Sequence, residues 1–223
     1  MSNEPENLKL AIIGGTGALG SGLAWRALRA GVAVHIGSRN PDRARDLATT
    51  LRETFPGADV TGSDNRGAAR AADMVALTVP FAHQLDTLGD IRADLAGKIL
   101  IDATVPLVPP KVARVQLPAE GSAAVRAQTF LGDGVDVVSA FHNVPAASLP
   151  GDHDVGCDVL VFGDVRLARE AVIALISAMG MKGWHGGPLV NSAAAEALTS
   201  VLIFVNKTYP PGHAGIRIAL GEG

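Results

Sequence analysis

The amino-acid sequence predicts an α/β fold: a Rossmann-type doubly wound parallel sheet with a small C-terminal α/β extension that forms a cleft. In the first half of the 223 residues, short apolar runs alternate with amphipathic segments of helical period. This alternation is typical of parallel strands that helices cover on both faces. A glycine-rich turn, Gly14–Gly20, lies directly between the first apolar run and the first helical segment. Strand, turn and helix in this order indicate the start of a dinucleotide-binding fold.

The hydrophobic pattern places the elements of the N-terminal part, residues 1–140, which we expect to form the dinucleotide-binding domain. The proline-rich segment Pro106–Ala119 is expected to be an irregular loop. The expected helices lie near Ala18–Arg29, Asp42–Phe55, Asn65–Arg70 and Phe81–Leu88. The expected strands are Leu8–Ile13, Ala33–Gly37, Asp59–Thr61, Met74–Val79, Lys98–Ile101 and Val135–Ser139.

Residues 141–223 are expected to form a smaller second domain. Its predicted elements are a strand at Val159–Phe162, a helix at Arg166–Met179 that ends at Gly180, a short strand at Lys182–Trp184 and a helix at Ser192–Lys207. Ser192 is the predicted N-cap of the last helix, with Glu196 in its early turns. Tyr209-Pro-Pro-Gly212 is expected to end that helix.

The glycine-rich turn fits the pattern G-x-G-x-x-G with Gly15, Gly17 and Gly20. The first glycine permits a tight bend, the second lets the backbone approach a pyrophosphate, and the third lets helix and strand pack closely. The N-terminus of the following helix offers free N–H groups and a partial positive charge to phosphate groups. The turn therefore predicts dinucleotide binding.

The residues after the second predicted strand indicate which dinucleotide is bound. An NAD site requires Asp or Glu there to hold the ribose 2′-hydroxyl, but this chain has Gly37-Ser38-Arg39. A hydroxyl and a guanidinium bind a 2′-phosphate through charge-assisted hydrogen bonds, and Arg43, one helical turn further on, adds a second cation. We therefore predict NADP.

Composition excludes several classes of protein. Hydrophobic residues make up 48% of the chain and charged residues 18%, so the chain is globular; the net charge of −3 argues against nucleic-acid binding. The lone cysteine, Cys157, excludes an internal disulfide and is expected to be buried or half-buried. The polar Met1–Asn7 has no signal-peptide core, so we expect a cytoplasmic protein. Polar residues interrupt Ala71–Val79 and Ala193–Val205 before either reaches the length of a bilayer span.

Other candidate groups keep alternatives open. Asp102 follows a predicted strand and serves either as a general base or, as we favour, as a cap of the next loop. His83 either contacts the nicotinamide side of the cleft or is solvated, and His35 is expected to be structural. Lys111 and Arg114 are either solvated or meet an anionic substrate tail. His153, His185 and His213 lack the spacing of zinc ligands, so no metal site is predicted.

The chain resembles the F420–NADP oxidoreductase family from Ala11 to Leu220. The resemblance rests on Gly14–Gly20, Gly37–Arg39, Leu77–His83, Val138–Ala147, Gly163-Asp164 and Gly187–Ser192. It implies hydride transfer between the nicotinamide C4 of NADP and C5 of the deazaflavin coenzyme F420, with the C-terminal domain enclosing the second substrate. It also implies that His142 and Val144 face the deazaflavin. The implied NADP-binding positions are Thr16, Ala18, Leu19, Ser38, Arg39 and Arg43, with Thr78, Val79 and Pro80 beneath the nicotinamide ribose.

This chain differs from the family pattern in Phe204–His213, which lies in the C-terminal part that, in the family, helps to enclose the deazaflavin. His142 is predicted to donate a hydrogen bond to the reduced ring, the alternative being a core histidine bonded to backbone. The competing functions are reduction of a small imine or ketone on the same fold and a non-enzymatic NADP sensor. We expect small-molecule substrates, a homodimer, and neither nucleic-acid nor membrane partners.

Overall fold

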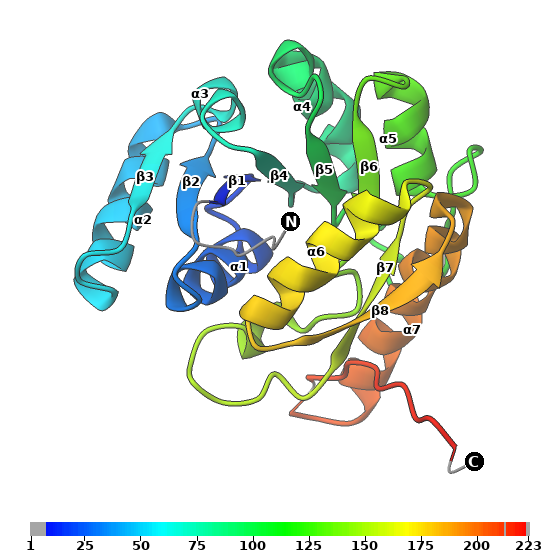
Figure 1. The fold of residues 1–223 in the computed structure, drawn as a ribbon. Coiled ribbons are helices and arrows are strands. Elements are labelled where there is room, and N and C mark those ends of the chain that lie inside the picture. Colours follow the sequence, from blue (N-terminus) through cyan, green and yellow to red (C-terminus); the bar gives the residue numbers. More distant parts are fainter. Residues whose placement is uncertain (1–7, 212, 222–223) are drawn as a thin grey trace.

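The computed structural model describes residues 8–211 and 213–221, and it contains one eight-stranded sheet with the order β3-β2-β1-β4-β5-β6-β7-β8 (Figure 1). All neighbouring strands from β3 to β6 run parallel, whereas β7 is antiparallel to β6 and β8 is parallel to β7. The strands are β1 (Lys9–Ile13), β2 (Ala33–Gly37), β3 (Val60–Ser63), β4 (Met74–Leu77), β5 (Ile99–Asp102), β6 (Asp136–Ser139), β7 (Asp158–Phe162) and β8 (Lys182–Gly187). The predicted doubly wound α/β sheet is confirmed.

Helices cover both faces of the sheet. The α-helices are α1 (Ala18–Arg29), α2 (Pro41–Thr54), α3 (Asn65–Arg70), α4 (Gln84–Ile91), α5 (Ala123–Leu131), α6 (Arg166–Ala178) and α7 (Ser192–Thr208). Short 3₁₀ turns are η2 (Phe81–His83), η3 (Arg92–Asp94), η4 (Ala146–Ser148) and η5 (Leu189–Asn191). The core on one face is shared by α1, α2 and α6, and the core on the other face by α3, α4 and α5.

Strand β1 lies at the centre of the sheet and shows why the pattern of the sequence produces this fold. Its Leu10 and Ile12 side chains enter one core, and Ala11 and Ile13 enter the other. Side chains of a strand alternate between the two faces, so a strand that is covered on both faces is apolar at every position. This burial is the main favourable contribution to folding.

The C-terminal strands continue the sheet of the N-terminal part, because β6 and β7 pair at Ser139 and Phe162. The division into domains at residue 140 stays a prediction. Strand β8 extends to Gly187, beyond the predicted Trp184. Gly180 ends α6 with a φ of 78°, a conformation that glycine adopts without strain, as predicted.

Three expectations are corrected by the structure. Helix α5 was not predicted; Ser122 caps its N-terminus by accepting a hydrogen bond from the N–H of Val125. Ser192 is not an N-cap: it is the first residue of α7, behind Asn191, and its hydroxyl donates to Ser122 Oγ at 2.8 Å. The third correction concerns length. The continuous helical segment Leu189–Thr208 has 20 residues, and an 18-residue window within it has a mean hydropathy of 1.4. By length and composition alone, the segment could span a bilayer.

Helix α7 nevertheless packs against the α/β domain through part of its surface. Glu196 is 1% exposed and binds α5, and Ala195 is 1% exposed.

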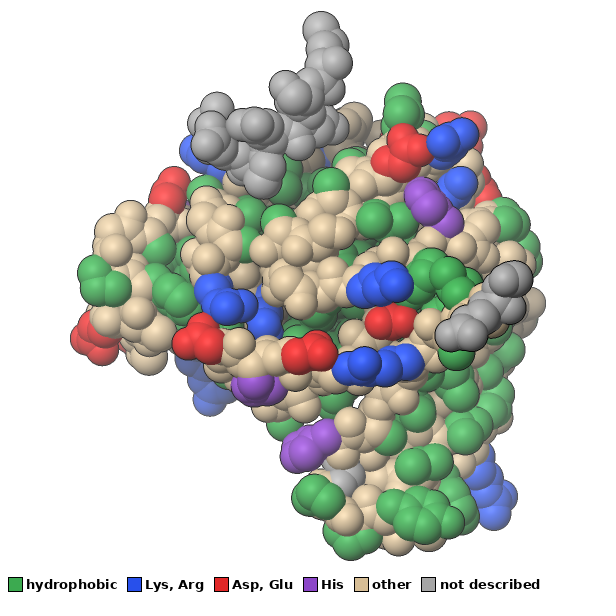
Figure 2. All heavy atoms as spheres, turned by 60° about the horizontal axis from the view of Figure 1, so that its bottom comes forward, with side chains coloured by type: hydrophobic (Ala, Val, Ile, Leu, Met, Phe, Trp, Pro, Cys, Tyr) green, Lys and Arg blue, Asp and Glu red, His purple; other side chains and the backbone are tan. Residues whose placement is uncertain are grey.

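On the face that Figure 2 turns forward, Lys and Arg side chains are interspersed with Asp and Glu side chains.

Candidate functional site

The glycine-rich turn is wrapped tightly against the ends of β1 and β2. The N–H groups of Gly14 and Gly15 both donate to the carbonyl of Gly37 at 3.1 Å, and Gly14 has a φ of 77°. A Cβ at Gly20 would lie 2.6 Å from Gly15 Cα, and one at Gly15 would lie 2.7 Å from the Ile12 carbonyl oxygen. These approaches are too close for any side chain. Gly15 and Gly20 therefore shape the turn and the helix–strand contact, as the motif predicts.

Helix α1 begins at the turn without a capping side chain. Gly17 is its N-cap, no side chain accepts a hydrogen bond from its first turn, and that turn contains no acidic residue. Ala18 and Leu19 are its first two residues, so their N–H groups are among the donors left without a helical partner. This end of α1 is therefore suited to bind an anion.

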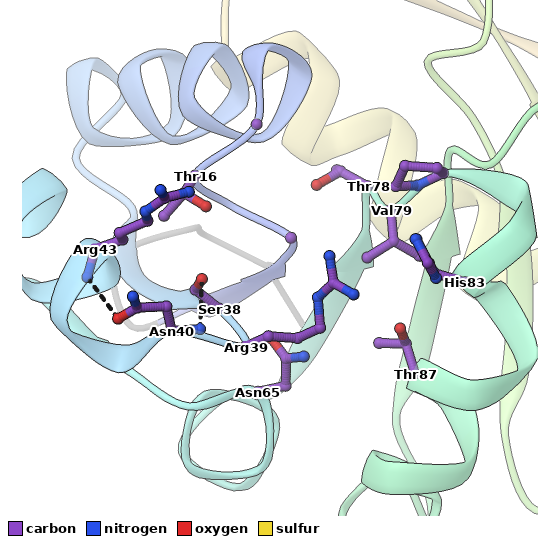
Figure 3. Close-up of a pocket in the computed structure, with 13 residues that line it drawn as sticks. Thr16, Ser38, Arg39, Asn40, Arg43, Asn65, Thr78, Val79, His83 and Thr87 are labelled. Carbon is purple, nitrogen blue, oxygen red and sulfur yellow. Dashed lines mark hydrogen bonds between the residues drawn. The ribbon is translucent and has the colours of Figure 1, made fainter.

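A cavity of about 360 Å³ opens beside the turn (Figure 3). It brings together predicted NADP residues that follow three different strands, β1, β2 and β4, whereas the predicted Ala18 and Leu19 do not line it. Its lining residues are Gly14, Thr16, Gly17, Ser38, Arg39, Asn40, Arg43, Asn65, Thr78, Val79, Pro80, His83 and Thr87. Because β1, β2 and β4 are neighbouring parallel strands, the loops after their carboxyl ends meet at one edge of the sheet, where ligands of open α/β sheets bind.

The cationic wall of the cavity lies at the start of α2. Ser38 Oγ accepts a hydrogen bond from the N–H of Asn40 at 3.2 Å. Asn40 caps α2 by accepting hydrogen bonds from Asp42 and Arg43, with Pro41 at the first helical position. In Figure 3 Arg43 extends toward Thr16, and Arg39 reaches across the cavity toward Val79. The loop after β2 and the first turn of α2 therefore present a hydroxyl and two guanidinium groups to the cavity.

The opposite wall is formed by the loop after β4. Thr78 is held in place because both its N–H and its hydroxyl donate to the carbonyl of Ile13 at 2.9 Å. Val79 and Pro80 follow, and His83 lies at the exposed rim. His83 lines the cavity and is also exposed at the start of α4, so both alternatives for this residue stay open.

Four residues of the cavity were missed from the sequence: Gly14, Asn40, Asn65 and Thr87. The dipeptide Asn40-Pro41 is the signature of a capped helix start and could have pointed to Asn40. Asn65 is 8% exposed, and its Oδ1 has no hydrogen-bond partner among the described residues. Since a buried amide oxygen without a partner is costly, Asn65 is available to bind a ligand.

His142 and Val144 do not line this cavity. They line a second, smaller cavity of about 130 Å³ between the loop after β6 and α7, together with Asn143, Pro145, Thr199, Leu202, Ile203, Asn206 and Ala214. The predicted nicotinamide and deazaflavin positions therefore belong to two separate cavities.

The backbone around His142 is fixed by α7. Thr199 Oγ1 donates to the carbonyl of His142 at 3.0 Å, and Asn143 Nδ2 donates to the carbonyl of Ala195 at 2.9 Å. Phe141, immediately before, has a φ of 70°, which is rare for a bulky residue. Such strained positions persist only where the surrounding structure fixes them, and they occur often at functional sites.

The residue His142 is 7% exposed, and its imidazole Nε2 lies 3.2 Å from Ser139 Oγ. Burial lowers its pKa to about 4, an effect that the main-chain carbonyl of Asp102 partly opposes. The ring is therefore neutral at pH 7. Nδ1 makes no hydrogen bond with the described residues.

Two buried carboxyl groups lie behind this region. Asp102 accepts hydrogen bonds from Thr104 N at 2.9 Å and from Gln84 Nε2 at 2.6 Å, so it caps the following loop, as favoured. Glu196 accepts from the N–H groups of Ala123 and Ala124 at 2.6 and 3.2 Å. Burial raises the pKa of Asp102 to about 6 and that of Glu196 to about 7. Glu196 thus joins α7 to the N-terminus of α5.

Glu196→Gln is expected to change how stability depends on pH. The pKa of Glu196 is raised from 4.5 to about 7, so its contribution to stability is fully present below pH 4.5 and is lost as pH rises through 7. The shift corresponds to about 3 kcal/mol in the free energy of unfolding. Urea unfolding at pH 5 and pH 8 will measure it. The variant should be markedly less destabilised at pH 8 than at pH 5, whereas exposed Glu120→Gln should give the same small effect at both; parallel pH curves for wild type and Glu196→Gln would refute this role.

The remaining candidate residues lie outside the two cavities described above. His35 Nε2 lies 2.9 Å from Ser63 Oγ, and Cys157 is 5% exposed; both expectations are confirmed. Lys111 and Arg114 line neither of the two cavities, and the carbonyl of Arg114 accepts a hydrogen bond from Ser200 on α7. Within residues 8–211 and 213–221, no group of three His, Cys, Asp or Glu side chains is arranged to hold a metal ion.

Comparison with known proteins agrees with this geometry. Residues 9–106 match the family described as NADP oxidoreductase, coenzyme F420-dependent. The F420-dependent NADP reductase of Methanothermobacter thermautotrophicus is 40% identical over 219 residues, which are 95% of this chain and 94% of the relative. That of Methanocaldococcus jannaschii is 37% identical over 220 residues, 95% of this chain and 98% of the relative.

A solved structure shares the whole architecture. The crystal structure of a proposed F420-dependent NADP reductase from Arthrobacter sp. FB24 superposes with a TM-score of 0.79 at 25% identity, covering 96% of this chain and 100% of that one. The aligned 95–96% of this chain is nearly its whole length. The chain belongs to the family of F420-dependent NADP reductases.

Proposed function

We propose that the chain is an oxidoreductase that transfers a hydride between the nicotinamide C4 of NADP(H) and C5 of the deazaflavin coenzyme F420. The observation that carries this proposal is the gathering of Ser38, Arg39 and Arg43 beside the uncapped N-terminus of α1 in one cavity. These groups match the 2′-phosphate and the pyrophosphate of NADP. The second partner, F420, is supported by membership of the family.

Hydride transfer between two rings depends mainly on position. The reacting carbons need to be about 3–3.5 Å apart, with bulk water excluded. We assign Thr78, Val79 and Pro80 to the nicotinamide ribose, since the two hydrogen bonds from Thr78 to Ile13 fix this loop at the edge of the cavity. Because His142 and Val144 line a different cavity, the nicotinamide has to extend from the larger cavity toward the smaller one for the rings to meet.

His142 is the residue that we assign to the deazaflavin. Reduction at C5 places negative charge on N1 and the C2 carbonyl, and a fixed N–H donor stabilises that charge as it forms. The imidazole is buried and neutral, its backbone is held by Thr199, and Nδ1 has no hydrogen-bond partner among the described residues. A neutral imidazole donates one hydrogen bond. Because Nδ1 is buried and Nε2 lies against Ser139 Oγ, this role requires the ring to turn toward the cavity when F420 binds.

The direct test is to mix the purified protein with NADPH and oxidised F420 and to follow the visible absorbance of the deazaflavin. We expect the absorbance to be lost with one NADPH consumed per F420, and flavins or small imines to react much more slowly. If NADPH binds but F420 is not reduced, the chain reduces another acceptor or senses NADP without catalysis.

The domain division at residue 140, the homodimer and the cytoplasmic location are further parts of the proposal. Helix α7 leaves apolar side chains exposed, among them Val201 and Phe204 at 48% and 61%. A second copy of the chain that covers this face would remove these side chains from water, which is favourable.

A further inference from the structure

The loop between β6 and β7, residues 140–157, lies between the two cavities described above. It begins with His142 and Val144, which line the smaller cavity against α7. It then passes to α1, where η4 packs against the helix that starts at the glycine-rich turn (Figure 1). The beginning of this loop is therefore positioned by α7, and a later part of it is positioned by α1.

Arg26 of α1 holds a later part of the loop, at Leu149 and His153, from inside the protein. Its side chain is among the largest fully buried side chains of the described structure, at 1% exposure. Nε donates to the carbonyl of Leu149 at 2.5 Å, and Nη2 donates to the carbonyl of His153 at 2.9 Å. Both partners are main-chain atoms of the loop. Burying a guanidinium costs free energy of desolvation. Here the buried group is hydrogen-bonded to main-chain carbonyls of the loop and not to a carboxylate, so it fixes the loop.

The surroundings of Arg26 complete the attachment. Gly22, one helical turn earlier, lies so close to the loop that a Cβ there would be 2.7 Å from Leu149 Cβ. Leu149 itself is fully buried in the core shared with α1. One turn later, Arg29 pairs with Asp152 at 2.8 Å, but this pair is exposed, at 39% and 86%. Such surface pairs contribute little, so Arg26 and Gly22 are the main attachment.

We propose that Arg26 is a positioning residue for the second substrate: through Leu149 and His153 it fixes the loop that carries His142 and Val144, and so sets the shape of the F420 cavity. This inference rests on the proposed function, because it takes the smaller cavity as the F420 site. Arg26 lines neither cavity. Its effect on F420 passes through the loop, and its effect on NADPH is expected to be small.

The test compares Arg26→Met with wild type in steady-state kinetics with NADPH and F420. We expect the KM for F420 to rise about tenfold or more, because a displacement caused far from the reacting atoms can have an effect of this size. The KM for NADPH should change by less than about twofold. Arg26→Lys donates from one ammonium group instead of a planar guanidinium, so its KM for F420 should lie between those of wild type and Arg26→Met. Arg29→Met is the matched control on the same helix and loop and should resemble wild type.

A second readout does not depend on turnover. Amide hydrogen exchange is expected to speed up in residues 142–155 of Arg26→Met while α1 keeps its protection. If Arg26→Met does not fold, Arg26→Lys decides by the same two criteria. The proposal is overturned if the KM for F420 is unchanged. It is also overturned if the KM values for F420 and NADPH rise in proportion while amide hydrogen exchange becomes faster throughout the protein. Failure of the wild type to reduce F420 refutes the proposed function instead, and hydrogen exchange still decides whether Arg26 orders the loop.

Discussion

Arg39→Glu is expected to weaken NADPH binding roughly a hundredfold or more while changing NADH binding by less than about threefold. The substitution removes charge-assisted hydrogen bonds to the 2′-phosphate, worth about 1.5–3 kcal/mol each, and adds a like charge beside that phosphate. NADH lacks this phosphate, so its affinity does not depend on the guanidinium. Each 1.4 kcal/mol is a tenfold change in Kd. Isothermal titration with both nucleotides measures the ratio.

The matched control for this experiment is Arg45→Glu. Arg45 lies on the same helix α2, pairs with Asp42 on the surface and does not line the cavity. The same charge reversal there should lower NADPH affinity only slightly, and added salt should remove most of the difference because salt screens exposed charges. Equal losses for NADPH and NADH in Arg39→Glu would show that Arg39 does not bind the 2′-phosphate.

His142→Ala is expected to slow the hydride step about ten- to a thousandfold. The upper limit is the loss of rate that follows removal of one donor from an oxyanion hole. Single-turnover kinetics with preformed NADPH complex isolates this step from product release. NADPH affinity should remain that of wild type, because His142 lines only the smaller cavity. His185→Ala, at an exposed position of β8, is the control and should have no effect.

Removal of a buried ring also leaves a hole, so stability needs to be measured beside the rate. Ser139→Ala separates the two effects, since it removes the Nε2 contact but leaves the imidazole in place. A folded His142→Ala variant with a near wild-type hydride step would reject the donor role and leave the residue as part of the cavity wall.

The cavity that we propose for NADP was predictable from sequence because its determinants are local. The glycines of the turn, Ser38 and Arg39 directly follow buried strands, and parallel strands bring the residues after their carboxyl ends to one edge of the sheet. The structure accordingly gathers Thr16, Arg39 and Thr78 around one cavity although 62 residues separate the first from the last.

Other features depend on contacts between distant segments. Helix α5 follows a proline-rich loop, and its start is completed by Glu196, 73 positions from Ala123 in sequence. No local pattern shows such a partner, although Ser122 before an Ala-rich segment was a usable cap signal. Ser192 looks like a cap by the same rule, but its hydroxyl is used by Ser122. The separation of His142 from the NADP cavity is likewise a result of how the loop after β6 lies between α1 and α7.

The most direct test of hydride transfer to F420 uses NADPH carrying deuterium at both positions of nicotinamide C4. After one turnover with the purified protein in ordinary water, mass spectrometry of the reduced F420 should show one deuterium, located at C5. The account requires this result, because a hydride passes between stacked rings without exchanging with water. Reduced F420 without deuterium, or no reduced F420 while NADPH is bound, would contradict it.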